Sequence, residues 1–376
     1  MWQTNEMGGG NLNISVQQMS LMPSDDYICI DIRGETAYQH GHIPGAVCWN
    51  GNEESLKRFS EYKKLIVYCT YGEKSIVTTE KLIQKGFEAY NLSGGYREWL
   101  LHCFKELDAE EVTRYDRQII LPQIGSEGQK KLKSSSVLIV GAGGLGSPAA
   151  LYLAGAGVGT IGIMDGDTVS VSNLQRQMIH NMETECVNKA ESAKLSLQKL
   201  NDRIDIRAYP HALTADNAEE IISKYDFIID AADNFETKFL INDACVLLEK
   251  AFCHAGILQF EGQVMTYVPG NNPCYRCVFE EIPESGSIPN CSQAGIIGAV
   301  AGIIGSIQAL EVVKYLLGAG ELLTGKIFVL DGLSMRTRIV RFSSKNESCK
   351  VCGNHKTITN IRENADEYMR KACGLT

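Results

Sequence analysis

The feature that most constrains this fold is a glycine-rich turn between an apolar run and a run of small apolar residues. The apolar run, Val137–Val140, predicts a buried parallel strand. The run Ser147–Ala154 predicts a helix, with Ser147 as its N-cap and a proline in its first turn. Glycines in such a turn let the backbone approach a phosphate, and the helix N-terminus presents free N–H groups. The sequence therefore predicts a nucleotide-binding turn with four glycines, at Gly141, Gly143, Gly144 and Gly146.

The residues after the next strand indicate which nucleotide this turn binds. The predicted strand Thr160–Met164 ends at Asp165, whose carboxylate is placed to bond ribose hydroxyls. The following loop carries three residues that a nicotinamide-binding pattern does not contain: Asn173, Arg176 and Gln177. Arg176 and the later Lys189 can pair with phosphates, and an enzyme that cleaves a triphosphate needs that positive charge. The pattern favours ATP, and a dinucleotide-dependent oxidoreductase is the alternative.

An Asp–Asn pair adds a candidate metal ligand to this site. Asp233 and Asn234 follow the apolar strand Phe227–Asp230, at the edge of the predicted sheet where ligands of open α/β sheets bind. Asp233 is therefore a candidate ligand for Mg²⁺ on the triphosphate, with Asn234 beside the nucleotide. The alternative is that Asp233 caps a helix over Asn234–Leu247.

Two Cys-x-x-Cys pairs predict a second, structural metal site. The chain has 13 cysteines, a number that fits a reducing compartment where thiols serve metal binding and chemistry. Four thiolates complete the tetrahedral shell of Zn²⁺ and leave no open position for catalysis. The predicted zinc ligands are Cys274, Cys277, Cys349 and Cys352.

Cys69 lies in a short loop directly after the predicted strand Leu65–Tyr68 and before a predicted helix. Inward-pointing N–H groups of such a loop form an anion-binding nest, and the helix N-terminus lowers the pKa of the thiol. A thiolate held in this way is suited to attack a sulfur donor and carry a persulfide. The alternative is a buried structural cysteine.

Composition narrows the class of partners. The net charge is −9 and no part of the chain is strongly basic, so we expect no nucleic-acid partner. The longest apolar stretch, Ala294–Leu310, is rich in glycine and alanine and predicts a buried helix, so we expect no membrane partner. The chain does not begin with a basic region and an apolar core, which predicts a cytoplasmic location.

The N-terminal part resembles a rhodanese (sulfurtransferase) domain in four motifs that occur in order. They are Asp31–Arg33, Gly41–Ala46, the Cys69 loop and Leu92–Trp99. The resemblance predicts a small α/β domain over residues 12–103, followed by a linker over residues 104–114. It implies that Cys69 carries sulfane sulfur.

The remainder, residues 115–376, resembles the ThiF/MoeB family, the bacterial relatives of ubiquitin-activating enzymes. The motifs that carry this resemblance are Arg114–Gln118, Gly141–Gly146, Asp165, Ser172–Gln177, Lys189–Glu191, Asp233–Asn234, both cysteine pairs and Asp331–Gly332. The resemblance implies a Rossmann-like adenylating domain with a structural zinc site. Such enzymes use ATP to adenylate the C-terminal Gly-Gly carboxylate of a small ubiquitin-like sulfur carrier protein.

The resemblance also assigns roles to single residues. It implies that Asn173, Arg176 and Lys189 contact the phosphates, that Asp165 binds the ribose and that Asp233 binds Mg²⁺. It further implies that Arg117 reaches the ATP of a partner subunit, which makes the protein a homodimer.

Cys291 is a further candidate, in the segment Pro289–Gly295 before a long apolar run. This segment matches the one in which a ThiF cysteine joins the carrier through an acyl-disulfide link. The alternative is a passive thiol near the zinc site.

Together these features predict an α/β protein with two activities: ATP-dependent adenylation of a carrier, and sulfur transfer from a Cys69 persulfide to give the carrier thiocarboxylate. Thiosulfate or a cysteine desulfurase is the expected sulfur donor. The pathway stays open among thiamine, molybdopterin, cysteine, tRNA thiolation and secondary metabolism. Besides the oxidoreductase, the alternatives are an adenylating enzyme with a non-sulfur substrate and a binding module with an inactive rhodanese domain.

Overall fold

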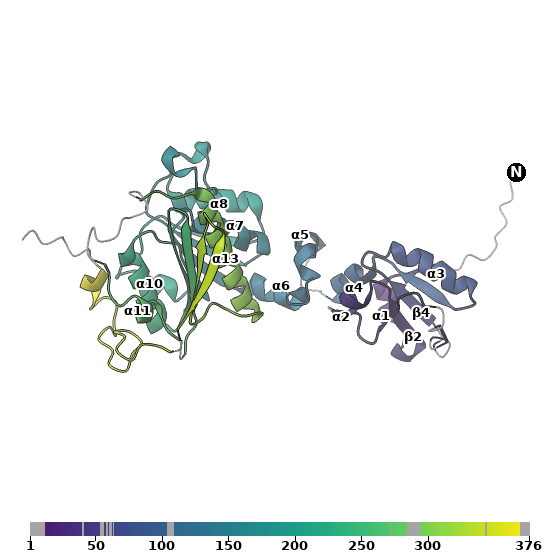
Figure 1. Cartoon of the computed structure of the whole chain (residues 1–376). Helices are drawn as coiled ribbons and strands as arrows, with labels where there is room; N and C mark the ends of the chain where they lie inside the picture. Colours follow the sequence, from purple (N-terminus) through teal and green to yellow (C-terminus); the bar gives the residue numbers. More distant parts are fainter. Residues whose placement is uncertain are drawn as a thin grey trace, which may run out of the picture. The chain divides into compact units, whose positions relative to one another are not determined.

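The computed structural model describes residues 12–39, 41–52, 56–57, 59, 62, 64–103, 109–270, 272–283, 294–342 and 344–368. The chain divides into two compact units, Met1–Lys130 and Lys131–Thr376, here called the first and the second unit. Each unit is built around its own sheet (Figure 1). Cys291 lies outside the described residues.

The first unit contains a five-stranded parallel sheet with the strand order β1-β5-β4-β2-β3. Its elements are β1 (Asn13–Ile14), α1 (Val16–Ser20), β2 (Tyr27–Asp31), α2 (Glu35–Gln39), β3 (Val47–Cys48), β4 (Lys64–Tyr68), α3 (Lys74–Gln84), β5 (Ala89–Leu92), α4 (Gly95–Cys103) and α5 (Ala109–Ile119). The helix α6 (Gly125–Ser134) crosses the boundary between the units. The central strands β2 and β4 are buried almost throughout, as their apolar runs predict.

Helix α5 packs into the first unit through its apolar face. Val112, Tyr115 and Ile119 recur at helical spacing and join the core cluster that also contains Tyr68 and Tyr96. The Arg114–Gln118 motif therefore lies on a helix whose buried side faces the core of the first unit.

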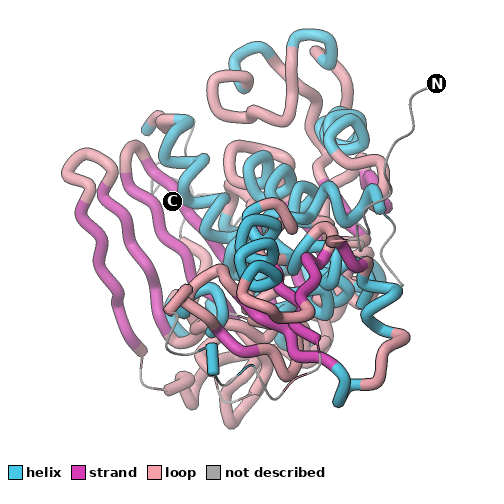
Figure 2. Tube along the Cα trace, turned by 90° about the vertical axis from the view of Figure 1, so that its right-hand side faces the viewer, coloured by secondary structure: helices cyan, strands magenta, loops and turns pink. Residues whose placement is uncertain are grey.

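The second unit contains an eight-stranded mixed sheet with the strand order β13-β12-β11-β10-β9-β6-β7-β8. The strands β8, β7, β6, β9 and β10 run parallel, whereas β11, β12 and β13 extend the sheet as antiparallel strands, which Figure 2 shows in magenta. The strands are β6 (Ser136–Val140), β7 (Thr160–Met164), β8 (Asp205–Tyr209), β9 (Phe227–Asp230), β10 (Ala251–Leu258), β11 (Glu261–Tyr267), β12 (Lys326–Asp331) and β13 (Arg336–Arg341).

Helices cover both faces of this sheet because the side chains of its central strands alternate between two cores. Val137 and Ile139 of β6 belong to one core cluster, and Leu138 and Val140 belong to the other. Figure 1 shows the two groups of helices on opposite sides of the sheet. They are α7 (Gly146–Ala156), α8 (Lys189–Leu200) and α13 (Gly298–Leu317) on the first face, and α9 (Ala218–Ile222), α10 (Phe235–Leu247) and α11 (Tyr275–Val278) on the second. This arrangement confirms the predicted fold class.

Helix α13 is long and apolar enough to cross a membrane by length and composition, and half of its most apolar window is buried inside the structure. It packs against α7, β10 and β11, and Val300, Ile304 and Val312 lie in the core. The predicted buried helix over 294–310 is thus present, although it begins at Gly298 and continues to Leu317.

Candidate functional site

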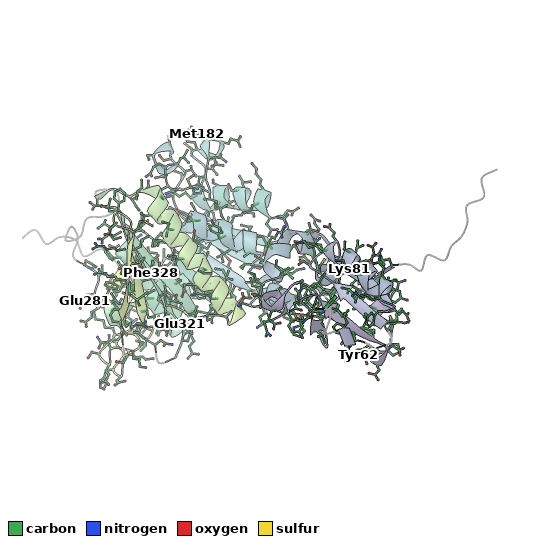
Figure 3. The ribbon with its side chains drawn as sticks, turned by 45° about the vertical axis from the view of Figure 1, so that its right-hand side comes forward. Tyr62, Lys81, Met182, Glu281, Glu321 and Phe328 are labelled. Carbon is green, nitrogen blue, oxygen red and sulfur yellow. The ribbon has the colours of Figure 1, made fainter. Side chains whose placement is uncertain are left out.

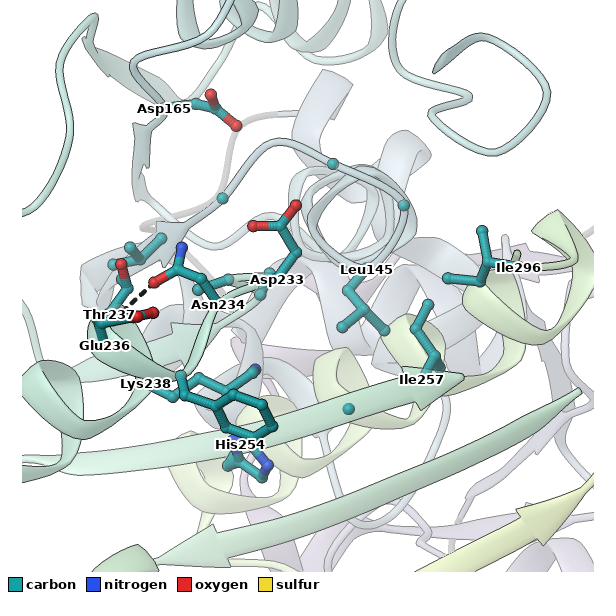
Figure 4. Close-up of a pocket in the computed structure, with 18 of the residues that line it drawn as sticks. Leu145, Asp165, Asp233, Asn234, Glu236, Thr237, Lys238, His254, Ile257 and Ile296 are labelled. Atoms are coloured by element: carbon teal, nitrogen blue, oxygen red, sulfur yellow. Dashed lines mark hydrogen bonds between the residues drawn. The ribbon is translucent and has the colours of Figure 1, made fainter. Parts of the chain in front are cut away.

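A pocket of about 730 Å³ opens at the carboxyl edge of the parallel strands in the second unit. Such a volume suits a small-molecule ligand or cofactor. The predicted nucleotide residues that line it are Gly141, Gly143, Gly144, Asp165, Arg176, Gln177, Lys189, Asp233 and Asn234. Figure 4 shows the carboxylates of Asp165 and Asp233 pointing toward one another across the open space. The parallel sheet therefore brings together residues that are almost 100 positions apart in the sequence, because its strands end at one edge.

Two of the glycines are required by close backbone contacts. Gly141 has a positive φ of 104°, and a Cβ there would lie 2.5 Å from the carbonyl oxygen of Ala231. A Cβ on Gly146, the first residue of α7, would collide with the carbonyl oxygen of Gly141. Gly146 thus shapes the turn without lining the pocket.

The predicted N-cap of α7 is wrong. The structure places Leu145 at the cap position, with no side-chain cap bond, and Ser147 lies inside the helix with a fully buried side chain. Side-chain capping would have occupied N–H groups at the helix start. In the described chain, the N–H groups of Gly143 and Gly144 instead donate to no protein acceptor, which leaves them available to an anion.

Asp165 is held in place by hydrogen bonds on both sides. Its carboxylate accepts from the backbone N–H groups of Ala142 (N···O 2.8 Å) and Asp167 (2.9 Å). The Asn188 side chain, which caps α8, donates to the carbonyl oxygens of Asp165 and Asp167. Burial raises the pKa of Asp165, although the Lys189 ammonium and the two N–H donors oppose this effect.

Of the two predicted phosphate-binding cations, Arg176 lies in the loop between β7 and α8, and Lys189 begins α8. Figure 3 shows Met182 at the outer tip of this loop. Lys189, at the first position of α8, is buried and pairs with the exposed carboxylate of Asp167 (Nζ···Oδ2 2.8 Å). Arg176 donates to Oδ1 of Asn173 (3.3 Å), which orients the guanidinium. Both cations line the pocket, whereas Asn173 supports one of them.

Asp233 is free to bind a ligand because Asn234 caps the next helix. The Asn234 side chain accepts from the N–H of Thr237 (2.8 Å) at the start of α10, as the dashed line in Figure 4 marks. The alternative role of Asp233 as the helix cap is therefore excluded. Its carboxylate is exposed and has no hydrogen-bond or ion-pair partner in the part of the chain that the structure describes.

A buried charged cluster beside this carboxylate was not predicted from the sequence. Asp230, at the end of β9, bonds Nδ1 of His254 (2.6 Å) and pairs with the ammonium of Lys238 (3.3 Å). Burial alone would raise the pKa of Asp230, but Lys238 and His254 outweigh it, so this pKa lies below its usual value. Figure 4 shows Lys238 and His254 close together, and His254 lies within β10. The sequence feature that could have indicated this cluster is Asp230, a charged residue at the end of the apolar strand β9.

The two Cys-x-x-Cys pairs come together in the second unit. The four sulfurs of Cys274, Cys277, Cys349 and Cys352 lie within 4.8 Å of one another. The recorded separations run from 3.3 to 3.8 Å. Tetrahedral Zn²⁺ with Zn–S bonds of about 2.3 Å requires sulfurs about 3.8 Å apart, so this donor set fits zinc.

Cys69 lies in a nest of hydrogen-bond donors, as predicted. Its sulfur accepts from the N–H of Gly72 (3.2 Å) and from the hydroxyl of Ser75 (3.4 Å), at the start of α3. Burial raises the pKa of the Cys69 thiol, but the Ser75 hydroxyl and the N–H groups of Ser75, Tyr71 and Gly72 outweigh it, so the pKa lies below its usual value. The sequence analysis did not single out the Ser75 hydroxyl, which lies in the first turn of α3.

The other rhodanese-like motifs support this loop. Gly95 has a φ of 62°, and a side chain there would collide with the carbonyl oxygen of Cys69. The N–H of Tyr96 donates to that same carbonyl (2.8 Å). Arg33 forms an ion pair with Asp31 (2.6 Å) and covers the ring of Tyr96. Gly95 and Tyr96 thus hold the backbone of the Cys69 loop in place.

Arg117 lies on α5 in the first unit. Its guanidinium donates to the hydroxyl of Tyr71 (2.8 Å), in the Cys69 loop. On the same helix Asp116 pairs with Arg97 (3.0 Å).

Two family models match the two parts of the chain. A family model described as the ThiF family matches residues 115–351. A second model, the rhodanese-like domain, matches residues 16–102.

The chain is also similar to curated proteins named adenylyltransferase and sulfurtransferase MOCS3. It is 42% identical to the one from Anopheles gambiae over 77% of this chain and 65% of that protein. It is 45% identical to the one from Culex quinquefasciatus, over 69% of this chain and 59% of that protein. The chain therefore spans about three fifths of the length of these relatives.

Solved structures show the same adenylating-domain fold. The crystal structure of PaaA is similar with a TM-score of 0.56 and 27% identity, over 64% of this chain and 76% of that chain. A crystal structure of E. coli MccB with ATP is similar with a TM-score of 0.54 and 20% identity, over 74% of this chain and 91% of that chain.

Proposed function

This chain belongs to the ThiF family and contains a rhodanese-like domain, and from that premise we propose that it activates a ubiquitin-like sulfur carrier with ATP and transfers sulfur to it. The observation that carries the proposal is that one chain contains both a pocket suited to ATP and a cysteine suited to carry sulfur. One is a pocket that combines a glycine turn, Asp165, Lys189 and Asp233. The other is a nest of donors around Cys69. The family argues against the oxidoreductase alternative.

In the first reaction, the Gly-Gly carboxylate of the carrier attacks the α-phosphorus of ATP and pyrophosphate leaves. The N–H groups of Gly143 and Gly144 would bind phosphate oxygens, and Asp165 would hold the ribose. Lys189 and Arg176 would neutralise the charge that develops on the phosphoryl oxygens. Asp233 would hold Mg²⁺, which supplies further charge neutralisation when bound. A carboxylate nucleophile is already ionised, so this step requires no protein base.

In the second reaction, the Cys69 thiolate attacks the outer sulfur of thiosulfate or of a cysteine desulfurase persulfide, the S–S bond breaks, and sulfite or the desulfurase thiolate leaves. The terminal sulfur of the Cys69 persulfide then attacks the acyl carbon, AMP leaves and an acyl disulfide forms. A thiol must cleave that disulfide to release the thiocarboxylate, and Cys291 is our candidate for this thiol. Two sites on one chain raise the effective concentration of the sulfur donor at the adenylate.

The proposal includes partners beyond this chain. We propose a homodimer in the cytoplasm in which Arg117 reaches the ATP of the partner subunit. Because Arg117 bonds Tyr71 in the first unit, that role requires Arg117 to exchange this contact for the nucleotide. The carrier is a small protein ending in Gly-Gly, of thiamine, molybdopterin or related sulfur metabolism.

The proposed adenylation is tested by exchange of radiolabelled pyrophosphate into ATP. Exchange that depends on a Gly-Gly-terminated carrier and on Mg²⁺ would support the proposal. A carrier truncated by its last glycine is the matched control. Exchange that proceeds equally with the truncated carrier would contradict the proposal that the Gly-Gly carboxylate is the substrate.

Loss of the proposed zinc is expected to destabilise the second unit. Cys352→Ser removes one of four thiolate ligands, and should release zinc and lower the free energy of unfolding by about 3 kcal/mol or more. The measurements are bound zinc by mass spectrometry of metals and the thermal midpoint. Cys186→Ser, at an exposed cysteine outside the cluster, is the control. A Cys352→Ser protein with wild-type zinc and midpoint would contradict the assignment.

Ser75 is expected to control the reactivity of Cys69 through its hydroxyl. Ser75→Ala removes a donor to the thiolate, so the pKa of Cys69 should rise and its alkylation by iodoacetamide at neutral pH should slow by about threefold to tenfold. The two rates should converge at alkaline pH, where both thiols are ionised. Thr79→Val, which removes a buried hydroxyl one turn further along α3, is the control. If the alkylation rates of wild type and Ser75→Ala depend on pH in the same way, with the same apparent pKa, the role of the hydroxyl is refuted.

A further inference from the structure

His180 lies inside the second unit, between the glycine turn and α8, and both of its ring nitrogens are hydrogen-bonded. Only 6% of its surface is exposed. Nε2 lies 2.9 Å from the carbonyl oxygen of Ala142, in the glycine turn. Nδ1 lies 2.8 Å from the hydroxyl oxygen of Ser192, in the first turn of α8. Neither the sequence motifs nor the proposed chemistry uses this histidine.

The two partners define where the proton of the ring lies. A carbonyl oxygen can only accept a hydrogen bond, so Nε2 carries the hydrogen and donates it to Ala142. Nδ1 is then the acceptor for the Ser192 hydroxyl. Burial, together with the nearby charge of Lys189, holds the pKa of His180 below its usual value and keeps the ring neutral. The ring therefore acts as a fixed donor toward the turn and a fixed acceptor toward the helix.

The bond to Ala142 determines which backbone groups of the turn face the pocket. The N–H of Ala142 donates to Asp165, and its carbonyl oxygen accepts from His180. The residue before the pocket-lining glycines is thus held at both of its polar groups. With this carbonyl bonded inward, the N–H groups of Gly143 and Gly144 remain for the nucleotide.

The bond to Ser192 connects the same turn to the helix that carries the buried cation. Ser192 and Lys189 are three residues apart in α8 and share one face of the first turn. One imidazole ring therefore spans the two elements that would contact the phosphates from different sides. A small shift between these elements would separate donors that must bind one ligand together.

We propose that His180 is a positioning residue of the nucleotide site, which sets the glycine turn against Lys189 and so determines affinity for ATP. This inference deepens the proposed function and rests on ATP being the nucleotide. Because His180 contacts no part of the pocket directly, its effect should appear in nucleotide affinity, with the affinity for the carrier unchanged.

The test compares three substitutions by calorimetric titration of the full chain with Mg-ATP. His180→Gln keeps an N–H donor at the position of Nε2, whereas His180→Asn keeps polar atoms only near Nδ1. We expect His180→Ala and His180→Asn to weaken ATP binding by about tenfold or more, and His180→Gln to stay within about threefold of wild type. The second expected result is faster hydrogen exchange in the alanine variant, without nucleotide, at the N–H of Ala142, which donates to Asp165 in the wild-type turn.

The outcomes separate this inference from the proposed function. Equal weakening by His180→Gln and His180→Ala, or wild-type affinity in a folded His180→Ala protein, would overturn the positioning role. If His180→Ala unfolds, the Gln and Asn variants still decide the question. Wild-type protein that binds ATP but never exchanges pyrophosphate with a carrier would count against adenylation and leave the His180 result intact. Wild-type protein that binds no ATP would overturn both.

Discussion

Asp233→Asn is expected to lower carrier-dependent pyrophosphate exchange by about a thousandfold. The substitution keeps the size of the side chain but removes the exposed carboxylate charge that we propose holds Mg²⁺. Asn234 already caps α10, so the helix should form as before and the loss should reflect catalysis. The measurement is the exchange rate as a function of Mg²⁺ concentration, with ATP saturating.

The control for this prediction is Asp216→Asn, at an exposed carboxylate that does not line the pocket. It should leave exchange unchanged. An Asp233→Asn enzyme with a near-wild-type rate and the same Mg²⁺ dependence would show that this carboxylate is not the magnesium ligand.

Cys69→Ser is expected to abolish sulfur transfer while carrier-dependent exchange continues. Serine preserves the shape of the nest, but its hydroxyl does not ionise near neutral pH and cannot carry a persulfide. Thiocarboxylate formation should fall by about a thousandfold or more, because the variant cannot form the persulfide that attacks the adenylate. The measurement is carrier thiocarboxylate formed with thiosulfate as the donor.

The matched control is Cys48→Ser, at a half-buried cysteine of the same unit outside the nest. It should retain sulfur transfer. If Cys69→Ser forms thiocarboxylate at the wild-type rate, then another cysteine carries the persulfide, or the sulfur reaches the adenylate directly from solution.

The sequence predicted the sheet strands well because their apolar runs are buried on both faces. Val137–Val140 and Leu65–Tyr68 both lie in strands, and each is followed by the expected loop and helix. The cluster of four thiols was predictable for a related reason, since two Cys-x-x-Cys pairs in one chain are typical of a shared metal site. These signals are local in sequence.

The exact helix starts and one long-range contact could not be predicted in the same way. Both Asp233 and Asn234 can cap a helix, and only the backbone geometry shows that Asn234 does so. Serine is a common N-cap residue, yet α7 already begins at Gly146, so Ser147 lies inside the helix. His180 has no sequence signal, because its two partners lie 38 positions before it and 12 positions after it.

Helix α5 carries the start of the ThiF-family match, which begins at residue 115, and belongs to the first unit. Its sequence motif was grouped with the adenylating part, whereas its apolar side packs into the core of the first unit. A sequence motif identifies a family. It does not show which core the apolar side chains of the same helix, Val112, Tyr115 and Ile119, pack into.

The central claim is that one chain both activates the carrier and gives it sulfur. The most direct measurement is the intact mass of a Gly-Gly-terminated carrier after incubation with this protein, Mg-ATP, thiosulfate and a thiol reductant. We predict replacement of one oxygen by one sulfur at the C-terminus, dependent on ATP and on Cys69. A carrier that gains AMP but never sulfur, even with a persulfide donor, would contradict the claim and favour an adenylating enzyme with a non-sulfur product.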